Sequence, residues 1–234
     1  MRVLELWRYP VKSLQGERLT AADVGPEGIE GDRAWALFDT GTGFGLTARR
    51  VPDLLFASAR TTGGRPEVVL PDGTVTDDDA VLSDWVGRPV QLRPAAFEGE
   101  RHYENPADVE TESRWDPFRG ADGAFHDNAT ARVTLLSTGS TGSWAPRRFR
   151  ANVLLDGAGE DALVGTRVRL GGAVLDVLDP VPRCVMTTRP QPGGIGRDTG
   201  VLKTIHRTHE GTLSVGAMPV TGGRVSVGDE LRGD

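Results

Sequence analysis

The stretch Thr166-Arg-Val-Arg-Leu-Gly-Gly-Ala-Val-Leu-Asp-Val-Leu178 consists of two short runs rich in Val and Leu, separated by Gly171-Gly172. Two glycines between strand-like runs are typical of a tight hairpin loop, because glycine adopts the positive φ angles that such loops need. The stretch therefore predicts an antiparallel β-hairpin over residues 166–178.

Similar runs recur along most of the chain, each bounded by Gly, Pro or Asp. Many short strands at this spacing predict a mainly β protein, built as a barrel or sandwich with a few short helices. Residues 67–76 predict a second hairpin, with Pro-Asp-Gly at its turn. The other expected strands are 2–9, 32–39, 90–93, 131–137, 148–156, 212–216 and 224–228.

Two short helices are expected among these strands. Asp77-Asp78-Asp79 offers an N-cap and an acidic first turn for a helix over residues 79–86, and Gly87 follows as a stop signal. Val201, Leu202 and Ile205 predict a second short helix. Residues 98–128 are polar with a few aromatic anchors, and we interpret them as a long functional loop or as the join between two halves.

Composition excludes several classes of protein. A net charge of −6 does not suit a sequence-independent nucleic-acid binder, which is normally basic. No apolar run approaches the roughly 18 residues of a membrane span, and Met1–Trp7 mixes charge into a short apolar alternation unlike a signal peptide. We therefore expect a cytoplasmic protein with no membrane association.

Cys184 is the only cysteine of the chain, which excludes an intramolecular disulfide and any site built from several thiolates. It follows an apolar strand and is preceded by Arg183, whose charge favours the reactive, metal-binding thiolate. A lone cysteine is also often only a small buried apolar residue. Position alone leaves both interpretations open.

Residues 148–156 suggest a second candidate site. If they form one strand, Arg148, Arg150 and Asn152 point to the same face. Guanidinium groups beside an amide would bind a phosphate or the edge of a heterocycle. The alternative is a solvated strand face, since arginine is the usual base of this chain.

Weaker anion-binding candidates are Lys12-Ser13, Arg33 and Thr47-Ala48-Arg49-Arg50. Gly41, Gly43 and Gly45 are not followed by a helix, so a dinucleotide-binding loop is not expected. The four histidines are scattered without matched acidic partners, so a histidine metal site is not expected either.

Taken together, these segments resemble the MOSC family with an N-terminal β-barrel domain, the group that includes the mitochondrial amidoxime reducing component and bacterial YcbX. The resemblance covers almost the whole chain, and it implies an N-terminal β-barrel domain over residues 1–95 and a MOSC β-barrel domain over residues 96–234. The matching segments are Tyr-Pro-Val-Lys-Ser at 9–13, Gly-Asp-Arg-Ala-Trp-Ala-Leu-Phe-Asp at 31–39, Arg-Phe-Arg-Ala-Asn-Val at 148–153, Arg-Cys-Val-Met-Thr-Thr at 183–188 and Val-Gly-Asp at 227–229.

The resemblance also implies a molybdenum-cofactor site. Cys184 would be the protein ligand of molybdenum, to which a soft thiolate is suited. The residues that the resemblance places around the molybdopterin and its phosphate are Lys12, Ser13, Arg33, Arg150, Asn152 and Arg183, with Thr47, Arg49, Ser137 and Thr138 as less certain members.

The implied activity is the reduction of small N-hydroxylated or N-oxygenated compounds. The chain has no ferredoxin-like cysteine set, so electrons would come from a separate reductase or ferredoxin-like partner. One alternative is a sulfur carrier that forms a persulfide on Cys184. Another is a protein that binds the cofactor without turnover. No nucleic-acid partner is expected, and the substrate-facing part of residues 98–128 is not defined by the resemblance.

Overall fold

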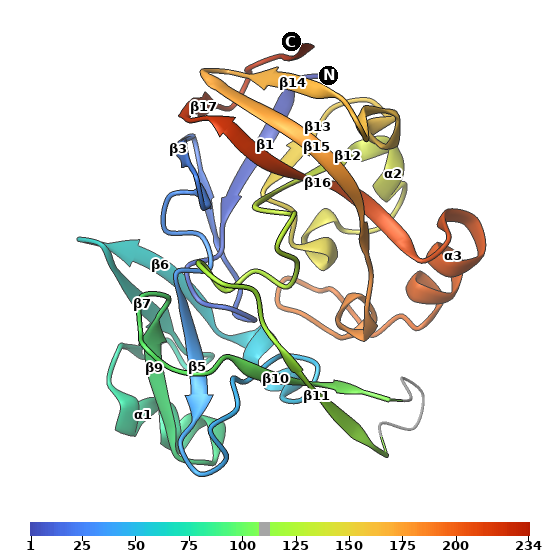
Figure 1. Ribbon diagram of the computed structural model, residues 1–234. Helices are drawn as coiled ribbons and strands as arrows, with labels where there is room; N and C mark the ends of the chain where they lie inside the picture. Colours follow the sequence, from blue (N-terminus) through green and yellow to red (C-terminus); the bar gives the residue numbers. More distant parts are fainter. Residues whose placement is uncertain (108–112) are drawn as a thin grey trace.

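A curled sheet of eight strands, bent into a half-barrel, forms the larger part of the protein (Figure 1). The computed structural model describes residues 1–107 and 113–234. Strand order across the sheet is β18-β14-β15-β16-β12-β13-β1-β2. These strands are β1 Val3–Arg8, β2 Glu17–Leu19, β12 Val133–Ser137, β13 Val153–Leu155, β14 Arg167–Leu170, β15 Ala173–Pro182, β16 Thr212–Thr221 and β18 Leu231–Gly233.

The predicted hairpin at residues 166–178 is confirmed at one side of this sheet. Strands β14 and β15 pair antiparallel, with Leu170 opposite Ala173, and Gly171 takes a φ of 55° at the turn. A Cβ at Gly171 would also lie 2.7 Å from the Arg224 carbonyl oxygen. Glycine is therefore required here both by backbone conformation and by close packing.

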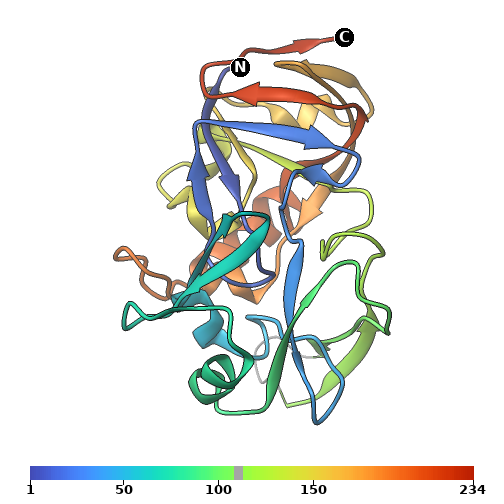
Figure 2. The same cartoon turned by 90° about the vertical axis from the view of Figure 1, so that its left-hand side faces the viewer.

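The first strand of the chain lies inside the same sheet as the last ones. Strand β1 pairs with β13, so that Val3 lies opposite Leu155, and with β2 on its other side. Strand β3 (Ala21–Gly25) likewise pairs with β17 (Gly223–Ser226) and with β4 (Gly28–Ile29). The two termini consequently lie together at one end of the molecule (Figure 2).

The other half of the molecule is built from small sheets. It has its own core, in which Leu37, Leu54, Leu55 and Leu82 are fully buried. Its elements are β5 Trp35–Asp39 paired with β9 Val90–Pro94, the three-stranded sheet of β6 Ser58–Thr62, β7 Arg65–Val69 and β8 Val75–Thr76, the helix α1 Asp79–Val86 and the 3-10 helix η1 Pro52–Phe56.

Residues 98–128, predicted as a long loop or a join, contain an antiparallel hairpin of β10 (His102–Pro106) and β11 (Trp115–Arg119). Tyr103 and Phe125 from this region pack with Phe38 in a separate aromatic cluster. Residues 108–112 of the predicted loop lie outside the described residues, and the described parts of the region connect the two halves and form a wall between them.

The remaining helical elements lie beside the large sheet. The predicted helix at 201–206 is confirmed as α3, Gly200–His209. The others are α2 Thr138–Thr141, η2 Pro146–Phe149, η3 Glu160–Leu163 and η4 Val185–Thr188. Within the described residues, no helix is long and apolar enough to cross a membrane. The predicted mainly β class with few short helices is confirmed.

The prediction of one strand over residues 148–156 is wrong. Residues 146–149 form the 3-10 helix η2, Arg150 takes a φ of 52°, and only Val153–Leu155 is extended strand. Pro146 favours the start of the 3-10 turn, because its fixed φ suits the first position of a helix and it needs no amide partner there. The alternating face expected for Arg148, Arg150 and Asn152 therefore does not exist.

Helix α1 gives a simple test of local stability. Asp78 caps it, accepting hydrogen bonds from the backbone N–H groups of Ala80 and Val81 at 2.8 and 3.1 Å. We expect Asp78→Ala to lower the free energy of unfolding by about 1 kcal/mol. Asp84→Ala, inside the same helix, should be neutral or slightly stabilising, because alanine has the higher helix propensity. Urea unfolding of both variants measures this, and equal losses would contradict the capping role.

Candidate functional site

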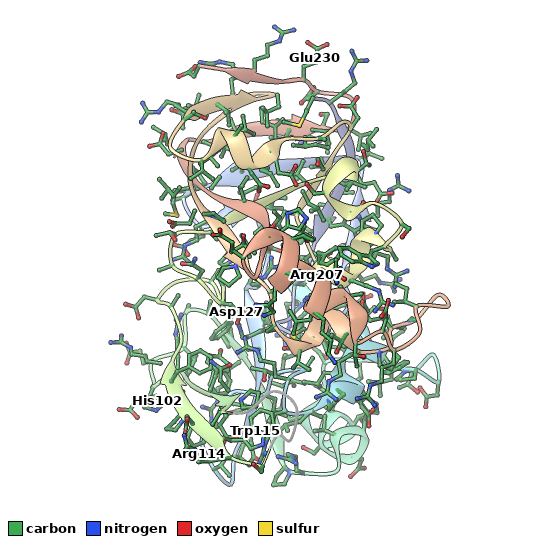
Figure 3. All side chains as sticks on the ribbon, turned by 90° about the vertical axis from the view of Figure 1, so that its right-hand side faces the viewer. His102, Arg114, Trp115, Asp127, Arg207 and Glu230 are labelled. Atoms are coloured by element: carbon green, nitrogen blue, oxygen red, sulfur yellow. The ribbon has the colours of Figure 1, made fainter. Side chains whose placement is uncertain are left out.

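A cavity of about 730 Å³ opens where the large sheet, the smaller half and the β10–β11 hairpin meet. Figure 3 shows Asp127 in this middle region, between the sheet end that carries Glu230 and the hairpin that carries His102 and Trp115. Among the described lining residues one, Asp127, is acidic, although the protein as a whole is acidic. The cationic lining residues are Lys12, Arg33, Arg49, Arg119, Arg148, Arg150 and Arg183.

Cys184 lines this cavity as a half-buried free thiol. It follows β15 after one intervening residue, Arg183, and lies at the start of η4, whose Thr187 N–H donates to the Cys184 carbonyl oxygen at 3.1 Å. The Cys184 side chain also lies within hydrogen-bonding reach of the Arg49 guanidinium, where the two groups interact electrostatically. The thiol is therefore placed beside a cationic side chain.

Asp127 joins two buried cations. Its Oδ1 accepts hydrogen bonds from Lys12 Nζ at 2.6 Å and from Arg49 Nη2 at 3.0 Å. Lys12 is only 6% exposed, whereas the Asp127 side chain is 60% exposed because it faces the open cavity. Burial lowers the pKa of Lys12, and Asp127 opposes that shift. Burial alone would raise the pKa of Asp127, but Lys12 and Arg49 hold it well below its usual range.

The ring of Tyr9 contacts two further arginines, Arg33 and Arg150. The Arg33 and Arg150 guanidinium carbons lie 5.1 and 4.4 Å from its ring centroid, and Arg33 is also paired with Asp32. Burial would lower the pKa of Arg33, but Asp32 raises it above its ordinary value. Arg150 has no such carboxylate partner among the described residues: it donates to the Leu14 carbonyl oxygen, and burial lowers its pKa to about 10. The aromatic face stabilises both cations by a cation–π interaction.

Several cavity residues hold a left-handed backbone. The φ angles are 72° at Ser13, 51° at Arg33 and 52° at Arg150. Each such conformation costs about 1–3 kcal/mol for a residue with a side chain, and such residues gather at functional sites. Of the five non-glycine residues with positive φ among those described, these three line the cavity and a fourth, Ser214, contacts Arg183.

Arg183 turns most of its guanidinium toward the protein itself. Its Nε donates to the Leu213 carbonyl oxygen at 2.7 Å, and its Nη1 donates to the Phe149 carbonyl oxygen at 2.8 Å. Burial lowers its pKa to about 10, and the nearby Cys184 opposes that shift. Arg183 thus fixes the chain that enters Cys184 as well as adding charge to the cavity.

The structure brings together most, but not all, of the residues predicted for the site. Lys12, Ser13, Arg33, Arg49, Arg150, Arg183 and Cys184 line the cavity. Thr47, Ser137, Thr138 and Asn152 do not line it.

The four outlying residues have other surroundings. Asn152 is fully buried, and its side-chain amide donates to the Trp7 carbonyl oxygen while its carbonyl accepts from Thr134. Ser137 is also fully buried and caps α2, whose first residue is Thr138. Thr47 lines a second, smaller hollow of about 140 Å³.

Sequence reasoning missed several lining residues. Asp127 falls within residues 98–128, which the sequence predicts only as a polar loop or join, and its segment has no periodic pattern. His126 is buried beside it, and Asn105 reaches the site from β10, where its side chain accepts from Arg49. The aromatic anchor at Phe125 was the available signal, since its carbonyl oxygen accepts from Lys12 at 3.0 Å.

The donor set fits an anionic cofactor that carries a soft metal. One thiol and several cations face the same cavity, and Nε of the buried Arg49 has no hydrogen-bond partner in the described structure. A buried N–H without a partner is costly, so it marks a place where a ligand acceptor would be stabilised. No cluster of three or more metal-binding side chains occurs among the described residues, so the protein would supply Cys184 as a single ligand.

The contacts of Asp127 with Lys12 and Arg49 predict that the stability of an Asp127 variant depends on anions. We expect Asp127→Asn to lower the free energy of unfolding by about 1–2 kcal/mol, less than the value for a fully buried pair because Asp127 is largely exposed to the cavity. Inorganic phosphate should then stabilise the variant more than the wild type, because two cations lack their carboxylate.

Urea unfolding with and without phosphate at constant ionic strength tests this expectation. Asp23→Asn is the matched control, since Asp23 pairs with Arg224 at 3.1 Å on the surface and neither residue lines the cavity. Equal responses of the Asp127 and Asp23 variants to phosphate would contradict it.

His126 predicts a dependence of stability on pH. Burial first, and then the Arg33 charge, lower the pKa of His126 to about 4. The unfolded state, with an ordinary histidine pKa of about 6.5, therefore binds more protons between those two values. Stability contributed by neutral His126 should be present above about pH 6.5 and lost as pH falls toward 4. The free energy of unfolding, measured with denaturant at several pH values across this window, should depend less steeply on pH in His126→Gln than in the wild type. An unchanged pH dependence would contradict the assignment.

Comparison with known proteins gives the family. The family model described as the MOSC N-terminal beta barrel domain matches residues 1–102, and the model described as the MOSC domain matches residues 118–232. No curated protein matches the chain. The division at residue 95 is not tested and stays a prediction.

The solved structures that match the chain are distant in sequence. The YuaD protein from Bacillus subtilis matches with 12% identity and a TM-score of 0.46, over 98% of this chain and 93% of that one. YiiM from Geobacillus stearothermophilus matches with 17% identity and a TM-score of 0.36, over 44% of this chain and 54% of that one. The two family models together span most of the chain, and the protein belongs to the MOSC family.

Proposed function

We propose that the protein is an oxidoreductase that binds the molybdenum cofactor through Cys184 and reduces small N-hydroxylated or N-oxygenated compounds. MOSC domains are associated with proteins of the molybdenum-cofactor sulfurase type and with cofactor binding in general. The observation that carries the proposal is the placement of the only thiol of the chain in a cavity of predominantly cationic residues.

The residues present would divide the work between the metal and the anionic part of the cofactor. Cys184 would hold molybdenum through its sulfur, as a soft ligand. Arg150 keeps guanidinium N–H groups free of carboxylate partners and would bind phosphate, with Arg33 beside it. The bound cofactor would supply the two electrons that, with two protons, convert an N–OH group to N–H and water.

The protein's own part in the reaction is orientation and exclusion of water. The hairpin strand β10 contributes Asn105 and Pro106 to the cavity wall, which narrows access from the solvent. Arg49 interacts with both the Cys184 side chain and the Asp127 carboxylate, and so links the two sides of the cavity. Lys12, an ammonium on the cavity wall, is placed to donate a proton or a hydrogen bond to a departing hydroxyl group.

Electrons would reach this site from a separate protein. The chain has one cysteine, so it cannot hold an iron–sulfur cluster of its own. A reductase or ferredoxin-like partner is therefore part of the proposal, together with a cytoplasmic location.

A persulfide carrier is the second candidate. The same cationic surroundings of Cys184 would stabilise a persulfide anion, and the association of MOSC domains with sulfurases favours it. In this case the protein would be isolated without molybdenum, and Cys184 would carry the mass of one additional sulfur atom. A cofactor-binding protein without turnover remains the third reading of the same cavity.

Metal and pterin analysis tests the proposal directly. Protein from a molybdenum-replete host should carry near-stoichiometric molybdenum and pterin, and Cys184→Ser should lose the metal, because a serine hydroxyl is a poor ligand for a soft site. The variant should stay folded, since it replaces one sulfur by oxygen. Absence of both metal and pterin from wild-type protein would overturn the proposal.

Activity is the second arm of the test. With an artificial reductant, loaded protein should reduce an N-hydroxylated compound such as an amidoxime, and kcat/KM should fall by more than about 100-fold in Cys184→Ser. Lys203→Ala is the control, because Lys203 lies on α3 and does not line the cavity. Full loading without turnover would favour the cofactor-binding protein.

A further inference from the structure

Arg148 is a buried cation whose role neither the cofactor nor a carboxylate explains. It lies in η2, it is 8% exposed, and it also lines the cavity. A buried guanidinium is stabilised when its N–H groups find well-aligned acceptors, since its charge is otherwise costly to desolvate. The hydrogen-bond acceptors of Arg148 therefore show which part of the protein it stabilises.

All of these acceptors belong to the chain that leaves Cys184. Arg148 Nη1 donates to the carbonyl oxygens of Thr187 at 3.1 Å and Arg189 at 3.4 Å, and its Nη2 donates to the Gly196 carbonyl oxygen at 2.7 Å. The Thr187 carbonyl lies within the 3-10 helix η4 and the Arg189 carbonyl directly after it. The Gly196 carbonyl lies further along the chain, where the following loop returns. A single planar guanidinium thus ties two arms of the segment 187–196 together.

The clamp reaches the cysteine through one residue. The Thr187 N–H and the Thr187 hydroxyl both donate to the Cys184 carbonyl oxygen, at 3.1 and 2.9 Å. Arg148 holds the carbonyl of the same threonine. On the other side of Cys184, Arg183 holds the entering chain through the carbonyls of Leu213 and Phe149. The cysteine is therefore fixed from both directions along the chain.

We propose that Arg148 is a positioning residue that fixes the direction of the Cys184 thiol by clamping the segment from Thr187 to Gly196. The effect of this clamp on metal binding rests on the proposed function, whereas the clamp itself is a property of the protein alone. Lysine cannot replace Arg148, because one ammonium lacks the planar fork that reaches three carbonyls. The sequence pattern had suggested that Arg148 faces an anion, whereas its donors serve the backbone.

The test uses the full chain in its cofactor-free form, with Arg148→Lys. Cys184 is the only cysteine, so alkylation by iodoacetamide, followed by whole-protein mass, reports on this thiol alone. We expect alkylation of the native protein and hydrogen exchange at the Thr187 amide to become about tenfold faster, because the loss of the clamp favours local opening. Molybdenum retention after loading should fall by about tenfold.

The matched control is Arg197→Lys, an exposed arginine in the same loop. It should leave alkylation and exchange at wild-type rates. If Arg148→Lys lowers only the thermal midpoint, with both rates equal to those of the control, Arg148 is a general stabilising residue and the proposal is overturned. A wild-type protein without molybdenum would overturn the proposed function, and the two rates would still decide on the clamp.

Thr187→Val provides a second variant in case Arg148→Lys does not fold. It removes the hydroxyl that binds the Cys184 carbonyl oxygen and keeps the size of the buried side chain. We expect a smaller acceleration of alkylation, about threefold, because the Thr187 N–H bond remains. An unchanged rate would overturn the connection between the clamp and the cysteine.

Discussion

The structure depends on holding several wholly or partly buried cations close together against their mutual repulsion. Lys12 and Arg49 are buried, Arg33 and Arg150 are half-buried, and all four converge on one cavity, where each charge costs free energy when it leaves water. The protein compensates in three ways: with the carboxylates Asp32 and Asp127, with the face of Tyr9, and with backbone carbonyl oxygens. Carbonyl oxygens stabilise a cation without neutralising it, so the cavity keeps a net positive charge that a bound anion can use.

The chain path explains why this cavity lies between the two halves. Strand β1 lies inside the large sheet, next to β13, so the turn that follows it brings Lys12 and Ser13 to the end of the sheet. There they meet Arg150, which precedes β13 in the sequence by only two residues. Strand β15 delivers Cys184 to the same edge after its long pairing with β16. The site is thus assembled by strand order and not by any one contiguous motif.

The sequence predicted well those features that are encoded locally. The hairpin around Gly171-Gly172 depends on a loop that glycine alone suits, and α1 depends on an aspartate cap and a glycine stop. Cys184 comes two residues after a strand with a clear pattern, and it lines the cavity; its role as a metal ligand stays a prediction. The mainly β class follows from many such local signals, which agree with one another.

Features that depend on tertiary contacts could not be read in this way. Alternation predicted a strand through Arg150, but packing against Tyr9 and the Leu14 carbonyl holds that residue in a left-handed conformation. Asn152 fitted a ligand pattern and is instead an internal link between neighbouring strands. Asp127 has no periodic context at all, and its importance appears only once Lys12 and Arg49 lie beside it.

At Ser13, Arg33 and Arg150, the left-handed backbone favours glycine, whereas the cavity requires a side chain. At such φ angles glycine is the least strained residue, yet glycine would remove the hydroxyl or the charge that faces the cavity. These positions are therefore ones where selection for folding alone and selection for ligand binding favour different residues. A family member that lost its ligand would be free to drift toward glycine or asparagine there and to become more stable. At Arg33 and Arg150, a charged side chain therefore reaches the cavity at a cost in backbone strain.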